Sequence, residues 1–101
     1  MTAQEVQAGI ANNTVIILDI REPYELDICS IDSLKIPMAE VSDRANEIPS
    51  DKTVAVMCRS GRRAAAVVNM LSTEHGLTNI VLLEGGILAW IEDIAPELES
   101  Y

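Results

Sequence analysis

Three short, nearly unbroken apolar runs, each followed by residues of helical period, constrain the fold of this chain more than any other feature. The runs cover residues 14–20, 53–57 and 79–83. They lack an alternating polar face, which is typical of strands covered on both sides in a parallel sheet. Strands that alternate with helices predict an α/β domain. We therefore expect a three-layer α/β/α fold around a mostly parallel sheet of four or five strands.

The N-terminal half also carries start signals for helices. Thr2 and Glu5 form a capping-box pattern, in which each side chain bonds the backbone amide of the other. Pro23 suits the first turn of a short helix. The helices expected in this half cover residues 3–11, 23–28 and 40–47, and a short strand covers residues 34–36.

In the C-terminal half the apolar period changes after Gly61. Apolar residues then recur on one helical face, and Gly76 is placed to end this helix in a left-handed conformation. A last helix is expected after the Gly85–Gly86 turn, with Trp90 packed in the core. No linker is expected before the tail that follows Pro96.

The totals limit the classes of protein to consider. At 101 residues, 49 % of them apolar, the chain fits one domain over residues 1–101. Its formal charge of −9 argues against a nucleic-acid partner. No apolar run approaches the ~18 residues of a membrane span, and no basic residue precedes Arg21, so we expect no membrane association and no signal peptide. The two cysteines are too few for a disulfide framework. We expect a reduced, cytoplasmic protein without metal or cofactor.

The hexapeptide Cys58-Arg-Ser-Gly-Arg-Arg63 is the candidate site. It holds three of the five arginines in a chain with 16 acidic and 7 basic residues. A strand, a tight loop and a helix aim backbone amides at an anion. Thiols at helix N-termini beside arginine ionise more readily than a free thiol, so Cys58 is a candidate nucleophile for anionic substrates. The alternative is a buried cysteine at a strand end below a solvated basic turn.

Four segments resemble, in order and spacing, motifs of the rhodanese family, the single-domain sulfurtransferases. The hexapeptide with Ala64 is similar to the family's active-site loop. The other three resemble its D-x-R-E motif, its I-P-L/M segment and its L-x-G-G-x-x-x-W motif. These segments cover residues 58–64, 18–23, 36–38 and 83–90.

The resemblance implies a double displacement. The Cys58 thiolate would attack the outer sulfur of thiosulfate or of a protein persulfide donor, and form a persulfide held by loop amides. A thiol, cyanide or a small sulfur-carrier protein would then accept the sulfur, which predicts ping-pong kinetics.

The resemblance also implies roles for the other loop residues. Arg59 and Arg63 match arginines of the family's loop and are the first candidates to bind a sulfonate, because guanidinium donors form a planar fork. Arg62 fills a variable position, where it faces solvent or adds positive field. Gly61 lets the loop turn, and Ser60 is a candidate donor to the persulfide.

Two alternatives from other classes stay open. Phosphatases and arsenate reductases share a C-x5-R loop, but here Ala64 fills the arginine position, and Met57 stands where many tyrosine phosphatases have histidine. The shorter loop suits a sulfur atom better than a phosphate, so sulfur transfer is preferred. The second alternative is a binding module that keeps the fold without catalysis, against which the cysteine and the arginines argue.

The remaining polar residues receive structural interpretations. We expect Asp19 and Arg21 to form an ion pair at the sheet edge. His75 lies at a helix C-terminus, where a cation is favourable and catalysis is not expected.

Cys29 is interpreted as a small buried thiol, with a second role as resolving thiol left open. The residues around it resemble those of rhodanese domains fused to enzymes that activate ubiquitin-like proteins. That resemblance favours a carrier protein as acceptor. Compared with the family, the first short strand is missing or reduced ahead of Thr2, which favours four strands over five.

Overall fold

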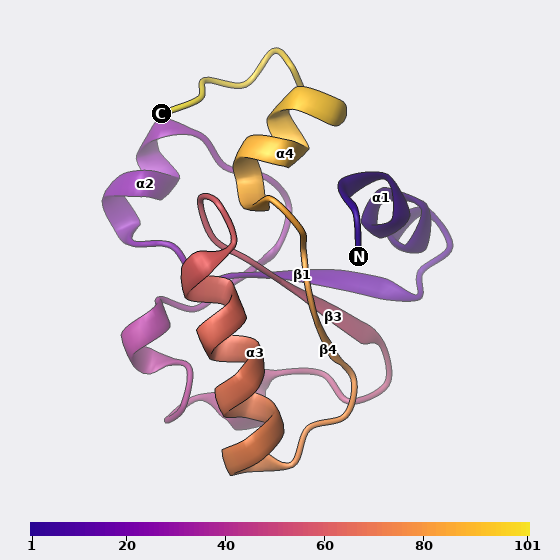
Figure 1. Cartoon of the computed structure of the whole chain (residues 1–101), viewed down its shortest axis with the longest axis vertical. Coiled ribbons are helices and arrows are strands. Elements are labelled where there is room, and N and C mark those ends of the chain that lie inside the picture. Colours follow the sequence, from indigo (N-terminus) through magenta and orange to yellow (C-terminus); the bar gives the residue numbers. More distant parts are fainter.

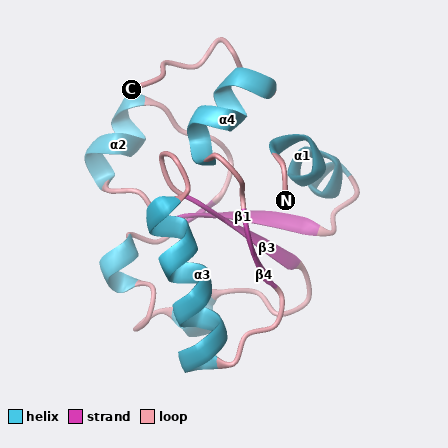
Figure 2. Cartoon of the chain, in the orientation of Figure 1, coloured by secondary structure: helices cyan, strands magenta, loops and turns pink.

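The computed structural model describes residues 1–101 as four strands, four α-helices and two 3-10 turns (Figures 1 and 2). The elements are, in order, α1 (Ala3–Ala11), β1 (Val15–Asp19), α2 (Pro23–Ile28), β2 (Leu34–Lys35), the turns Met38–Glu40 and Ala45–Glu47, β3 (Thr53–Met57), α3 (Arg62–His75), β4 (Ile80–Leu82) and α4 (Gly86–Asp93). None of the helices is long and apolar enough to cross a membrane.

The sheet is entirely parallel, with the strand order β2-β1-β3-β4. The α/β class and the four-stranded version of the predicted sheet are therefore confirmed. From β1 the chain runs outward to β2 and then crosses back to β3 on the other side. The reversal places a topological switch point between the carboxyl ends of β1 and β3, where open α/β sheets bind their ligands. Asp19 of β1 lies in register with Met57 of β3 at that edge.

Two apolar clusters cover the two faces of the sheet. On one face, α1 and α4 pack over strand residues such as Ile17 and Met57. On the other, α3 and the two 3-10 turns pack over neighbours such as Leu18 and Val56. Because side chains alternate across a strand, consecutive apolar residues enter opposite clusters. Burial on both faces therefore explains the unbroken apolar runs in the sequence. Figure 1 shows α3 on one side of the sheet and α1 and α4 on the other.

The boundaries of the helices agree closely with their sequence signals. Thr2 Oγ1 accepts a hydrogen bond from the Glu5 amide at 3.2 Å, and the Thr2 amide donates one to Glu5 Oε1 at 2.9 Å. Pro23 is the first residue of α2. Gly76 ends α3 with a left-handed φ of 65°.

The helix expected over residues 40–47 is wrong in form. Residues 38–47 instead form two separate 3-10 turns, Met38–Glu40 and Ala45–Glu47. This segment buries only Val41 between them, so a continuous helix would gain little from packing. Arg44 bridges the turns by ion pairs to Glu40 and Glu47 at 3.0 and 2.8 Å.

Met1 extends the sheet beyond β4. Its amino group donates to the Leu82 carbonyl at 2.8 Å, and its carbonyl accepts from the Glu84 amide at 2.9 Å. This is the hydrogen-bond pattern of a parallel strand pair. One residue therefore occupies the place expected for a reduced first strand.

Candidate active site

Cys58 follows β3 directly and lies at the switch point. Cys58 is only 1 % exposed, and it belongs to the cluster beneath α3. The Gly61 amide donates to Cys58 Sγ at 3.1 Å, and the Ala64 amide does so at 3.4 Å. Gly61 is the N-cap residue of α3 and Ala64 lies in its first turn, where backbone amides have no acceptor within the helix. The loop thus curls around the sulfur and presents it to a positive helix end.

Further loop amides remain available. Those of Arg59 and Ser60 donate to no atom of the chain. Gly61 adopts a φ of 109°, a left-handed value that an L side chain rarely takes. This conformation turns the loop into α3, in agreement with the role expected for Gly61.

The N-terminus of α4 holds the other side of the loop. The Ile87 amide donates to the Cys58 carbonyl at 2.8 Å, and the Leu88 amide donates to the Arg59 carbonyl at 3.2 Å. Gly86 makes this approach possible, because a Cβ there would lie 2.5 Å from both carbonyl oxygens. The sequence predicts a turn at the Gly85–Gly86 pair. The structure shows that Gly86 also supports the loop.

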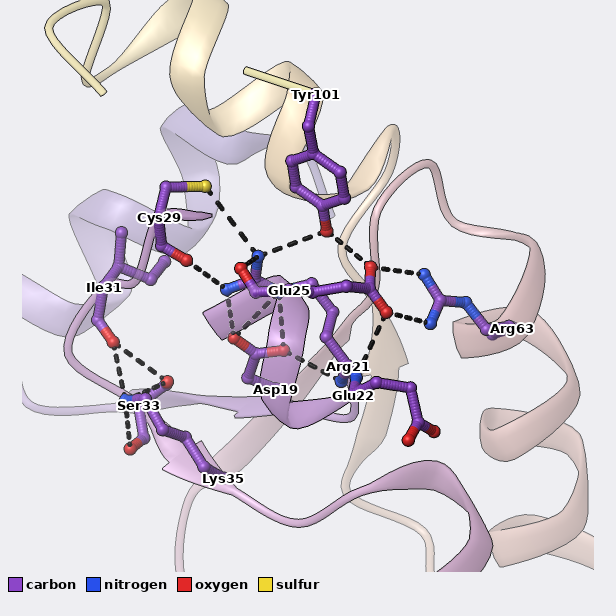
Figure 3. A network of polar contacts seen from close by, with 10 residues as sticks. All are labelled: Asp19, Arg21, Glu22, Glu25, Cys29, Ile31, Ser33, Lys35, Arg63 and Tyr101. Atoms are coloured by element: carbon purple, nitrogen blue, oxygen red, sulfur yellow. Dashed lines mark hydrogen bonds and ion pairs between the residues drawn. The ribbon is translucent and has the colours of Figure 1, made fainter. Parts of the chain in front are cut away.

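Arg63 does not project freely toward the sulfur. It forms a two-pronged ion pair with Glu25 of α2, with Nη1–Oε1 and Nη2–Oε2 separations of 2.7 and 2.9 Å (Figure 3). Glu25 is buried and also accepts from the Tyr101 hydroxyl at 2.5 Å. The hydrogen bonds from Arg63 lower the pKa of Glu25 to about 2, against the effect of burial. Those same bonds, followed by the charges of Glu25 and Cys58, raise the pKa of Arg63.

Arg21 and Asp19 form the predicted ion pair, with Nη2–Oδ2 at 2.8 Å and both side chains fully buried. The guanidinium also donates to the Cys29 carbonyl at 3.0 Å, the Glu25 carbonyl at 3.4 Å and the Tyr101 hydroxyl at 3.2 Å. A buried arginine with all of these partners joins β1 to the end of α2. Figure 3 shows this network leading through Glu25 to Arg63.

The residues after Pro96 are not a free linker. The tail returns to α2, as Figure 1 shows, and Tyr101 reaches the buried network. Its ring lies under the Arg59 guanidinium, 5.1 Å from ring centroid to Cζ, and its main-chain carbonyl accepts from Arg59 Nε and Nη2. Burial first of all, with the bond to Glu25 adding to it, raises the pKa of Tyr101 to about 12. Arg59 of the loop therefore contacts Tyr101 of the C-terminal tail.

The other predicted residues are placed as follows. Arg59 and Ser60 are exposed on the loop, and Arg62 is exposed as the first residue of α3. His75 is exposed at the far end of α3, where it bonds Ser42 Oγ at 3.0 Å. Trp90 is a core residue, as predicted. Cys29 is buried as expected, but in the cluster on the opposite face from that of Cys58, and both thiols are free.

Sequence reasoning missed Glu25 and Tyr101. Glu25 lies in the first turn of α2, where a glutamate gives no local signal of burial. Tyr101 lies in a polar tail, 76 residues from Glu25 along the chain. Only the three-dimensional fold brings these residues to the loop.

The fold and the loop define an α/β domain that presents a buried thiol within a ring of amides. The family model of the rhodanese-like domain matches residues 2–93, so the chain belongs to the rhodanese-like domain family.

Three similar proteins place the chain within this family. A protein named sulfurtransferase from Allochromatium vinosum is 38 % identical over 82 % of this chain and 81 % of its own. A probable adenylyltransferase/sulfurtransferase, MoeZ, from Mycobacterium tuberculosis is 31 % identical over 84 % of this chain, which spans only 22 % of that protein. The crystal structure of a rhodanese-related protein from Thermoplasma volcanium is 41 % identical, with a TM-score of 0.83 over 95 % of this chain and 93 % of that one.

Proposed function

We propose that this chain is a sulfurtransferase that carries sulfane sulfur as a persulfide of Cys58. The observation that carries the proposal is the position of Sγ, buried at the N-terminus of α3 and bonded by the Gly61 and Ala64 amides. Backbone donors in that arrangement stabilise an anionic sulfur. Membership of the rhodanese-like family and the sulfurtransferase named among its relatives support the same reaction.

The first half-reaction loads the sulfur. The Cys58 thiolate attacks the outer sulfur of thiosulfate or of a persulfide donor, the donor's S–S bond breaks, and sulfite or a thiolate leaves with the electron pair. The free amides of Arg59 and Ser60 are donors that a second sulfur atom could use. Arg59, Arg62 and Arg63 supply positive field around the loop, and Gly61 sets its turn.

The second half-reaction unloads the sulfur to a nucleophile. A thiol, cyanide or a small sulfur-carrier protein attacks the outer sulfur, and Cys58 leaves as thiolate. The carrier protein is supported by the resemblance of the residues around Cys29 to rhodanese domains fused to activators of ubiquitin-like proteins. A reduced compartment such as the cytoplasm would keep the thiol free for this cycle.

The test is transfer of sulfur to cyanide, measured as thiocyanate, with each donor in turn. The native chain and Cys29→Ser should both turn over, because Cys29 lies in the cluster on the opposite face of the sheet. Cys58→Ser should be inactive. Equal activity of Cys58→Ser and the native chain would refute the proposal. No activity in a native chain whose thiols are shown to be free would favour the binding module instead.

A further inference from the structure

We propose that the uncovered edge of β1 is a docking site for an extended peptide segment of a partner protein, which pairs with β1 as a short added strand. The site lies at the amino end of β1, apart from the Cys58 loop. It is therefore a second site, and its existence does not depend on sulfur transfer.

The strand β2 covers only the carboxyl half of β1, because it pairs with Leu18 and Asp19 alone. Ile20 donates to β3, and amides alternate between the two sides of a strand, so the Val15 and Ile17 amides point to the side of β2. These two amides donate to no atom of the chain, and the Val15 carbonyl accepts from none. Val15 and Ile17 are only 6 % and 2 % exposed. Buried backbone groups without partners are costly, so a ligand that pairs with them gains free energy.

A groove of about 280 Å³ runs along this edge, and five of the eight residues that line it are apolar. Val15 and Ile17 belong to the cluster beneath α1 and α4, whereas Ile16 and Leu34 pack against the cluster on the other face. Residues of both faces meet in one groove because no strand continues the sheet here. The helix α1 adds Ile10, which is 41 % exposed. An added strand would place its alternating side chains against both walls.

The backbone groups in the groove match an extended peptide. The Val15 and Ile17 amides are separated by two residues of strand, or about 6.6 Å. Carbonyl oxygens on one side of an extended chain repeat at the same spacing, and an amide between them can donate to the Val15 carbonyl. Main-chain pairing of this kind gives peptides their affinity for a sheet edge. A small apolar molecule would fill the groove but leave both amides unpaired.

Charge favours a basic peptide segment. Asp32 is the one charged residue that lines the groove, and it is exposed and forms no ion pair. The nearby amines of Lys35 and Lys52 already bond oxygens of Ser33 and Asn13, at 3.0 and 2.6 Å. The whole chain carries a formal charge of −9. Both the free carboxylate and the net charge attract a cationic partner.

A peptide in this groove would leave the catalytic loop open. Val15 lies four residues before Asp19, or about 13 Å along the strand. Asp19 is in register with Met57, which precedes Cys58. In Figure 1 the amino end of β1 lies beside α1, and the loop after β3 lies at the opposite end of the strands. The docked segment would therefore tether a partner without covering the thiol.

The experiment is an amide-resolved NMR titration of the native chain with the peptide acetyl-Lys-Val-Val-Val-Lys-amide. Hydrogen exchange at the Val15 and Ile17 amides should slow by about tenfold or more in the saturated complex, because both amides gain acceptors. The control peptide has the same sequence with two adjacent backbone nitrogens methylated, so that neither of its edges can pair. It should bind about tenfold more weakly. Equal binding of the two peptides, or no binding of either at millimolar concentration, would overturn the inference.

Two variants test the location. Ile10→Glu removes apolar surface from the groove and should weaken peptide binding about tenfold. Tyr24→Glu is the matched control, because Tyr24 is the other exposed large apolar residue, at 66 %, and lies on α2 outside the groove. Its affinity should stay within about twofold of the native value. Ile10→Ala replaces Ile10→Glu if that variant does not fold. Equal weakening in both variants would overturn the inference.

Two further outcomes would name another occupant or another place. A native dimer that Ile10→Glu dissociates, measured by sedimentation, would show that a second copy of the chain covers the edge, and would overturn the choice of partner. Peptide that blocks sulfur loading of Cys58 would bind at the loop and not at β1, which would also overturn the inference. Loading unchanged within about twofold in the saturated complex would support it.

Discussion

At the scale of a single residue, a substitution at Gly86 tests how α4 supports the loop that carries Cys58. A Cβ at this position would lie 2.5 Å from the Cys58 and Arg59 carbonyl oxygens, so Gly86→Ala must push the loop away from α4. Displacing the sulfur by about an ångström should slow the loading of Cys58 roughly a hundredfold. The measurement is the rate of sulfur loading, together with urea unfolding.

Gly76→Ala is the matched control. Gly76 has a φ of 65° and Gly86 one of 61°, but no atom lies within 4 Å of a Cβ placed at Gly76. The control should lose about 1–2 kcal/mol through backbone strain and keep its loading rate. Equal loading rates in the two variants would show that contact with the loop is unimportant.

Glu25 gives a prediction about pH. Its folded pKa is about 2, below the ordinary 4.5, so its ionised form stabilises the folded state. This stability is fully present above pH 4.5 and is lost as the pH falls toward 2. Glu25→Gln should therefore be less stable than the native chain by on the order of 3 kcal/mol at pH 7.

The measurement is urea unfolding of both proteins at pH 7, 4 and 2.5. The stability difference should shrink across the two acidic points. A difference that stays constant with pH would mean that the ion pair with Arg63 does not stabilise Glu25 as a carboxylate.

The C-terminal tail gives a prediction at the scale of an element. The Tyr101 hydroxyl bonds Glu25 and Arg21, and both bonds involve a charged group. Tyr101→Phe should raise the rate at which a glutamate-specific protease cleaves after Glu97 and Glu99, by roughly tenfold or more. Tyr24→Phe is the control, because Tyr24 is 66 % exposed. The same rate in both variants would contradict docking through the hydroxyl.

Raising the pH should release the same tail. The pKa of Tyr101 is raised to about 12 from the ordinary 10, so docking stabilises the neutral phenol. That stabilisation is complete below pH 10 and disappears as the pH rises through 12. Proteolysis of the native tail should therefore accelerate over this interval, relative to Tyr101→Phe, whose tail has no phenol to ionise.

At the scale of the whole molecule, the net charge of the chain predicts how salt affects the rate of sulfur loading onto Cys58. A chain with a formal charge of −9 repels the thiosulfate dianion, and salt screens that repulsion. The loading rate with thiosulfate should therefore rise with ionic strength. The rate with an uncharged alkyl persulfide should stay nearly constant. A thiosulfate rate that falls with salt would mean that the loop arginines dominate the field.

At the scale of the whole molecule, the strands and helices could be predicted from the sequence more completely than the surroundings of Cys58. Val15–Asp19 and Thr53–Met57 could be predicted as strands because burial on both faces leaves an unbroken apolar run. Cys58 could be located because it follows such a strand and precedes a helix. Local patterns of this kind need only neighbouring residues.

The surroundings of the loop could not be predicted in the same way. The bond from Arg63 to Glu25 joins residues 38 apart, and the bond from Tyr101 to Glu25 joins residues 76 apart. Neither pair leaves a periodic trace in the sequence. The prediction of a helix over residues 40–47 was wrong for a related reason. How much of this segment is buried depends on residues that are close in space but distant in the sequence.

The central claim is that Cys58 carries sulfur, and intact-protein mass spectrometry tests it most directly. The native chain, Cys58→Ser and Cys29→Ser would each be incubated with glutathione persulfide and, separately, with thiosulfate. The native chain and Cys29→Ser should gain the mass of one sulfur atom that a reductant removes, and Cys58→Ser should gain none. A sulfur adduct that persists in Cys58→Ser, or its absence from a native chain with a free Cys58 thiol, would contradict the claim.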